Sequence, residues 1–88
     1  MIRTYSEEMI VLSKVRKTVR GVPVAEILSE STNKGKPREV TIHFFGKAAE
    51  EAMESLIPGA RYTYRGYVGI EEETNQLKLI AAKFAVIA

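Results

Sequence analysis

The stretch TIHFFGKAAEEAMESL, residues 41–56, changes its hydrophobic period at Gly46. Before this glycine the residues alternate as in a half-buried β-strand, which begins at Glu39. The alternation puts three side chains on each face of the strand, Val40, Ile42 and Phe44 on one and Thr41, His43 and Phe45 on the other. After the glycine, residues 47–57 have the period of an amphipathic helix, which Pro58 and Gly59 end. The stretch therefore predicts a strand that leads directly into a short helix.

Two strand patterns precede this stretch. Residues 9–15 form a β-branched run that turns basic up to Arg20, and residues 22–27 resume the pattern after Gly21. The polar segment SESTNKGKPR, residues 29–38, offers little apolar surface to bury and predicts a loop. The N-terminal part of the chain is therefore expected to form two strands followed by a long polar connection.

Two further strands are predicted after the helix, over residues 61–70 and 77–87, with the turn EEETNQ between them. Three strands, a helix and two strands in one domain, residues 1–88, are the layout of the OB-fold, a mainly β, five-stranded Greek-key barrel. Gly66 agrees with a barrel, because a sharply curled strand needs a glycine on its concave side. An antiparallel sheet with the helix on one face is the alternative, which periodicity alone leaves open.

The composition excludes several kinds of chemistry. The 88 residues contain no cysteine, all eleven acidic residues are glutamates, and His43 is the only histidine. Disulfides, thiolate metal sites, multi-histidine zinc sites and triads with aspartate are therefore excluded, and we expect neither an enzyme nor a metal ion, other cofactor or small-molecule substrate. The sequence shows no signal peptide and no apolar run of about 18 residues that could span a membrane, so a cytoplasmic protein is expected.

The positive charge is concentrated in the first forty residues. The net charge is +2 and the pI is about 9.0, but residues 1–40 hold eight lysines and arginines against five glutamates. Seven of these cations form two clusters, Lys14, Arg16, Lys17 and Arg20 in the first and Lys34, Lys36 and Arg38 in the polar loop. A charge run is usually a solvated face, but OB-fold loops also follow a phosphate backbone, so we predict that both clusters contact nucleic acid.

The adjacent aromatics Phe44 and Phe45 must face opposite ways. In the functional interpretation Phe44 fills the barrel and Phe45 lies on the ligand-facing surface beside Thr41 and His43, where a base can stack on its ring. In the alternative interpretation both belong to cores, and the helix covers Phe45.

A second aromatic candidate is Tyr67, which shares a strand face with Thr63 and Arg65. An aromatic ring, a cation and a hydroxyl on one face suit base stacking and a phosphate contact, although an oligomer interface would use them equally well. Tyr62 and Tyr64 share the face of Gly66 and are predicted to lie in the core.

The segment HFFGKAAEEAMESLIPGARYTYRGYV, residues 43–68, resembles the bacterial and phage single-stranded DNA-binding proteins. In that family a strand ends in Phe-Gly-Lys and is followed by an Ala-Glu helix, a glycine, and an alternating strand that runs to another glycine. The matching residues here are Phe45, Gly46, Lys47, Ala49, Glu50, Gly59, Tyr62, Tyr64 and Gly66. The resemblance implies an OB-fold that binds single-stranded DNA without sequence preference in replication or recombination, with a base stacked on Phe45.

The sequence also departs from this family. It contains no tryptophan, whereas the family often stacks bases on several, and no acidic tail follows the last strand. The resemblance therefore implies a minimal form, such as a phage, plasmid or accessory replication protein, which associates as a dimer or tetramer. The alternative is an OB-fold adaptor or assembly subunit that binds protein partners or RNA.

Overall fold

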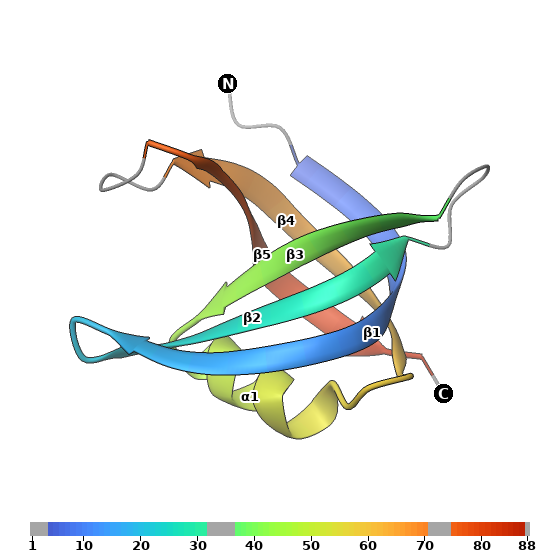
Figure 1. Cartoon of the computed structure of the whole chain (residues 1–88), viewed down its shortest axis with the longest axis horizontal. Coiled ribbons are helices and arrows are strands. Elements are labelled where there is room, and N and C mark those ends of the chain that lie inside the picture. The colour runs from blue at the N-terminus through green and yellow to red at the C-terminus, as the bar shows by residue number, and fades with distance from the viewer. Residues whose placement is uncertain (1–3, 32–36, 71–74, 88) are drawn as a thin grey trace.

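The computed structural model of the chain describes residues 4–31, 37–70 and 75–87. These residues form β1 (Thr4–Val19), β2 (Val22–Ser31), β3 (Arg38–Phe45), α1 (Lys47–Ser55), β4 (Arg61–Ile70) and β5 (Leu77–Val86). The strands pair in the order β1, β2, β3, β5, β4, and β4 pairs with β1 to close a barrel (Figure 1). The predicted OB-fold, with one helix between the third and fourth strands, is confirmed. The alternative of an open sheet is therefore wrong.

Strand β2 is longer than the sequence predicted. Ser29, Glu30 and Ser31, assigned above to the polar loop, pair with β1 on one side and with β3 on the other. The Ser29 side chain is buried, and its hydroxyl shares a hydrogen bond of 2.6 Å with the hydroxyl of Tyr62. Ser29 enters the barrel because the neighbouring strands pair with its backbone and Tyr62 supplies a hydrogen-bond partner for its hydroxyl.

The barrel core is built from residues on the inner faces of the strands. Phe44 is fully buried, as predicted, and meets Phe84 edge-to-face at a centroid distance of 5.3 Å. The other buried core residues are Met9, Val11, Ala25, Ile27, Ile42, Ala49, Ala52, Leu56, Tyr62, Tyr64 and Ala81. Three of these come from α1 and the residue that ends it, and the helix packs against β2 and β3 below the strands in Figure 1.

At Gly66, strands β4 and β5 approach each other closely. A side chain on Gly66 would collide with the carbonyl oxygen of Ile80, which belongs to the backbone and cannot move aside cheaply. The pairing register of the two strands also shifts here, because Arg65 pairs with Lys83 whereas Gly66 pairs with Ala81. The glycine and the bulge together let the strands bend into the barrel, as predicted for Gly66.

Because Tyr62 is buried, we predict that the free energy of unfolding decreases at alkaline pH. Burial raises the pKa of Tyr62 from 10.0 to about 12, against a smaller lowering by the hydrogen bond with Ser29. The unfolded chain therefore loses this proton near pH 10 while the folded chain keeps it, so the contribution to stability is complete below pH 10 and is lost between pH 10 and 12. Relative to Tyr62→Phe, we expect the wild type to lose about 1.4 kcal/mol of unfolding free energy between pH 8 and pH 11, measured by urea unfolding. A difference between the two proteins that stays constant with pH would contradict this assignment.

Candidate nucleic-acid interface

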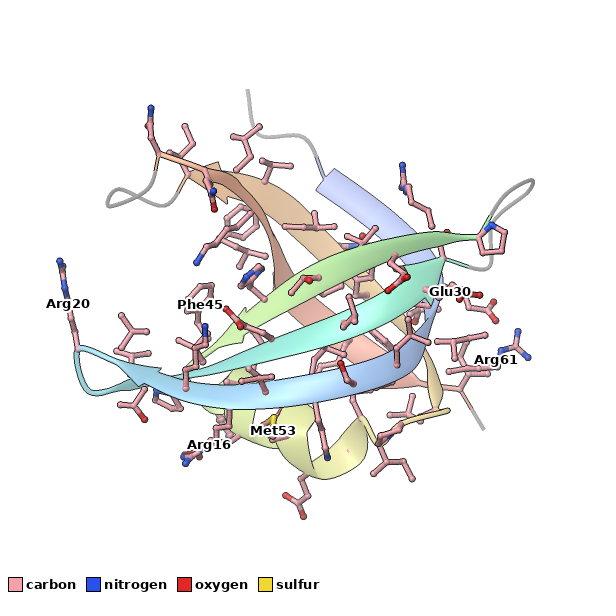
Figure 2. The ribbon with its side chains drawn as sticks, viewed as in Figure 1. Arg16, Arg20, Glu30, Phe45, Met53 and Arg61 are labelled. Carbon is pink, nitrogen blue, oxygen red and sulfur yellow. The ribbon has the colours of Figure 1, made fainter. Side chains whose placement is uncertain are left out.

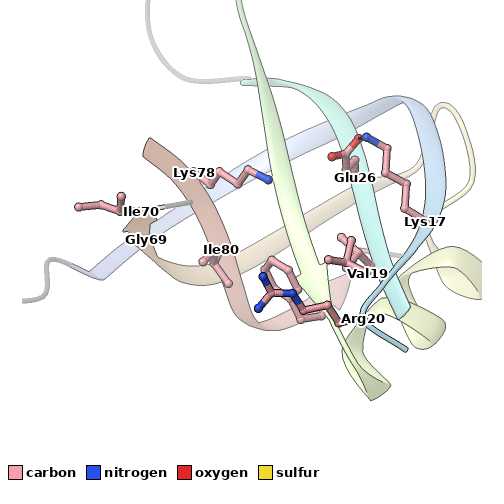
Figure 3. A pocket seen from close by; sticks show the side chains of 10 residues that line it. Lys17, Val19, Arg20, Glu26, Gly69, Ile70, Lys78 and Ile80 are labelled. Carbon is pink, nitrogen blue, oxygen red and sulfur yellow. Dashed lines mark ion pairs between the residues drawn. The ribbon is translucent and has the colours of Figure 1, made fainter. Parts of the chain in front are cut away.

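An open groove of about 320 Å³ lies on the outer surface of the barrel, beside the turn between β1 and β2. We call it the Phe45 groove. It is lined by Lys17, Val19 and Arg20 from β1 and the turn, Val24, Glu26 and Phe45 from β2 and β3, and Gly69, Ile70, Lys78 and Ile80 from β4 and β5. Figure 3 shows these side chains, which come from segments that are far apart in the sequence. The lining combines an apolar floor with three cations and one carboxylate.

Phe45 lies on the opposite face of β3 from the buried Phe44. It is 40% exposed and lies outside the core cluster. Its pairing partner on β2 is Val24, which is also outside that cluster but is only 4% exposed. The backbone N–H of Gly46 donates to the carbonyl of Pro23 at 2.8 Å and holds the end of β3 against β2. The backbone beside Phe45 is thus held against β2, and the Phe45 ring is partly exposed.

The first basic cluster divides between two sides of β1, because successive side chains of a strand point to opposite faces. Lys14 donates to the carbonyl of Met53 in α1 at 2.6 Å, and Arg16 is 3.7 Å from the carboxylate of Glu50 in the same helix. Figure 2 shows Arg16 and Met53 on the helix side, with Phe45 on the other side of the strands. Lys14 and Arg16 therefore support the helix and do not line the Phe45 groove.

Arg20 occupies a backbone conformation that few arginines adopt. The pair Val19 and Val22 closes a two-residue turn in which Arg20 has φ 52° and Gly21 has φ 79°. Two positive φ values are the signature of a type I′ turn, whose first position favours asparagine, aspartate or glycine. The turn carries the Arg20 side chain into the Phe45 groove at the tip of the hairpin (Figures 2 and 3).

A row of paired outer-face residues crosses four strands beside the groove. Glu26 on β2 pairs with His43 on β3, His43 pairs with Ile80 on β5, and Ile80 pairs with Tyr67 on β4. Tyr67 is 37% exposed and adjoins the groove through Ile80, although it does not line it. The next outer-face pair is Arg65 with Lys83, both exposed.

His43 is more enclosed than a stacking residue would be. It is 8% exposed, its Nδ1 is 3.3 Å from the carbonyl oxygen of Leu79, and its Nε2 is 3.6 Å from the carboxylate of Glu26. The same carboxylate is 3.1 Å from the Lys17 ammonium. His43 and Lys17 thus flank Glu26.

A second groove, of about 420 Å³, contains the remaining predicted site residues that the structure describes. Arg38, Thr41 and His43 line it together with Lys78, which lines the Phe45 groove as well. Lys34 and Lys36 lie outside the described residues. Sequence reasoning missed Lys78 and Lys83, because the last strand reads as an apolar run in which single lysines draw no attention.

In the part of the chain that the structure describes, no three histidine or acidic side chains lie close enough together to hold a metal ion. No helix among these residues has the length and apolar character needed to cross a membrane.

The fold has close counterparts among solved structures. No protein-family model matches the sequence, and no curated protein matches it. The second single-stranded DNA-binding protein (SSBb) of Mycobacterium smegmatis superposes with a TM-score of 0.81 at 15% identity, over 98% of this chain and 89% of that one. The small single-stranded DNA-binding protein of Streptomyces coelicolor superposes with a TM-score of 0.81 at 13% identity, over 99% of this chain and 94% of that one. The priB protein of Ralstonia solanacearum superposes with a TM-score of 0.77 at 15% identity, over 99% of this chain and 100% of that one. At these identities the likeness shows the fold, and the fold is the one that the resemblance implied.

Because Lys14 and Lys17 lie on opposite sides of β1, we expect different effects when each is replaced by methionine. Lys14→Met keeps the apolar stem but loses the hydrogen bond to α1, so we expect a loss of about 1 kcal/mol in unfolding free energy with unchanged affinity for an oligonucleotide. Lys17→Met is expected to weaken binding and to reduce the slope of log K against log salt by about 0.7, with little loss of stability. Urea unfolding and a salt series of oligonucleotide titrations measure both. Equal losses of affinity in the two variants would show that the division of the cluster is irrelevant to binding.

Replacing Arg20 in the turn should stabilise the fold and weaken oligonucleotide binding. Arg20→Asn places a residue that tolerates positive φ at the first turn position, so the unfolding free energy should rise by about 1 kcal/mol. The same change removes a cation from the groove and should weaken oligonucleotide binding. Thermal unfolding and titration of one preparation test both effects, and a variant that binds as tightly as the wild type would remove Arg20 from the interface.

Proposed function

We propose that this protein binds single-stranded DNA without sequence preference. The observation that carries the proposal is the exposed ring of Phe45 in a groove that also contains the cations Lys17, Arg20 and Lys78. An aromatic platform beside positive charges is the combination with which proteins hold unpaired strands, since every base has a face that can stack and every nucleotide has a phosphate. Two of the similar solved structures, those from Mycobacterium smegmatis and Streptomyces coelicolor, are of single-stranded DNA-binding proteins, which supports this assignment.

The groove also lies where OB-folds receive oligonucleotides. In this fold the face of the second and third strands and the loops after the first and fourth strands form the ligand surface. Here β2 and β3 supply Val24 and Phe45, the turn after β1 supplies Arg20, and the residues that flank the connection from β4 to β5 supply Ile70 and Lys78. The strand would pass Phe45 and continue over the shared Lys78 toward Arg38 and Thr41 in the second groove.

The biological role that follows is protection of unpaired strands in the cytoplasm during replication or recombination, by occupancy rather than by catalysis. Tyr67 and the exposed pair Arg65 and Lys83 extend the surface. Two cations directly opposite each other in a sheet repel, and a phosphate between them would relieve this repulsion. Association into a dimer or tetramer through exposed apolar residues of β1 and β5 belongs to the same proposal, and light scattering of the purified chain measures it.

Titration of fluorescently labelled strands tests the proposal. Oligo-dT, oligo-rU and a DNA duplex of equal length are compared at low and at moderate salt. We expect strand binding at low salt that weakens as salt rises, because bound lysines and arginines release counterions from the phosphates. The comparison with oligo-rU measures how far the sugar matters. Absence of strand binding at low salt, or equal affinity for the duplex, would refute the proposal.

Phe45→Ala tests the stacking contact itself. The substitution should cost about 1–3 kcal/mol of binding free energy and leave the fold intact, since the ring is partly exposed and lies outside the core cluster. Ile57→Ala is a matched control, because Ile57 is also an exposed apolar residue but lies outside both grooves. Unfolding of Phe45→Ala would instead support the alternative in which Phe45 belongs to a core.

A further inference from the structure

Glu26 places a carboxylate inside the Phe45 groove. It is the one acidic side chain among the described residues that line this groove. Glu26 follows Val24 by two residues on β2, so both point to the same face, and Val24 is the pairing partner of Phe45. A negative charge at this position opposes phosphate binding. If the groove bound only phosphates, its affinity for them would be higher without the Glu26 carboxylate.

Two neighbours hold the carboxylate in place without using up its hydrogen-bonding capacity. The Lys17 ammonium lies 3.1 Å from Oε1, and Nε2 of His43 lies 3.6 Å from Oε2 (Figure 3 shows the pair with Lys17). The Glu26 side chain is 23% exposed. Since an ionised carboxylate accepts about four hydrogen bonds, its two oxygens can still accept donors from the groove side. Glu26 is therefore a positioned acceptor next to the stacking platform.

We propose that Glu26 makes the Phe45 groove prefer bases that carry an exocyclic amino group over thymine and uracil. The inference rests on the proposed binding of single-stranded DNA and modifies one part of it: strands of any sequence bind, but bases with an amino group bind more tightly in this groove. A base stacked on Phe45 directs its edge along the sheet toward the neighbouring strand. Cytosine, adenine and guanine offer amino hydrogens there, which a glutamate accepts. Thymine and uracil flank their N3–H with two carbonyl oxygens, which the carboxylate repels.

The preference can be measured with homopolymers of dC and dU of equal length. The two bases differ in the group at C4 and the proton at N3, so the comparison exchanges an amino donor for a carbonyl acceptor. Wild type is expected to bind oligo-dC more tightly than oligo-dU by about tenfold, the effect of one charged hydrogen bond in a partly exposed site. In Glu26→Gln this ratio should fall toward one, chiefly through tighter binding of oligo-dU. Glu51→Gln, on the exposed face of α1, is the matched control and should keep the wild-type ratio.

The outcomes separate this inference from the proposed function. Wild type that binds both homopolymers at low salt with a ratio near one overturns the base preference and leaves strand binding standing, and this measurement needs no variant to fold. Glu26→Gln that binds both strands more tightly by the same factor shows Glu26 to be only a repulsive charge, which also overturns the inference. Failure of wild type to bind either strand overturns both proposals.

Discussion

The structure depends on the close approach of β4 to β5 at Gly66. Because this position has no side chain, the Ile80 backbone can lie against it, and the bulge opposite Arg65 lets the strands bend. The bend takes β5 back to β3, where the parallel pairs of Ile42 with Leu79 and His43 with Ile80 join the two strands. The Ile80 carbonyl thus lies against Gly66, its backbone pairs with His43 of β3, and it lines the Phe45 groove.

Closure also separates residues that the sequence groups together. On β3 the backbone directs Phe44 inward against Phe84 and Phe45 outward into the groove. On β1 the same alternation directs Lys14 toward α1 and Lys17 toward Glu26. The inner residues pack the core of the barrel, and the outer residues form the surface that we propose to bind oligonucleotides.

One groove residue conflicts with the local preference of its position. Arg20 has a positive φ, a backbone conformation that favours asparagine or glycine. Departures of this kind concentrate at functional sites, because binding there matters more than local stability. The strained turn at Arg20 therefore agrees with the binding surface that we propose at the hairpin tip.

The sequence by itself determined the order of the elements, the opposite faces of Phe44 and Phe45, and the burial of Tyr62 and Tyr64, because these depend on the local hydrophobic period. It also indicated the need for Gly66, because only a residue without a side chain allows a sharply curled strand. It assigned Ser29 to Ser31 to a loop, since polarity does not reveal that strands lie on both sides or that Tyr62 offers a partner. Only the tertiary structure decided which outer-face residues meet. Strand β5 lies between β3 and β4, so Lys78 and Ile80 join Phe45 across more than thirty residues of sequence. Such contacts depend on strand order and register, which no local pattern encodes.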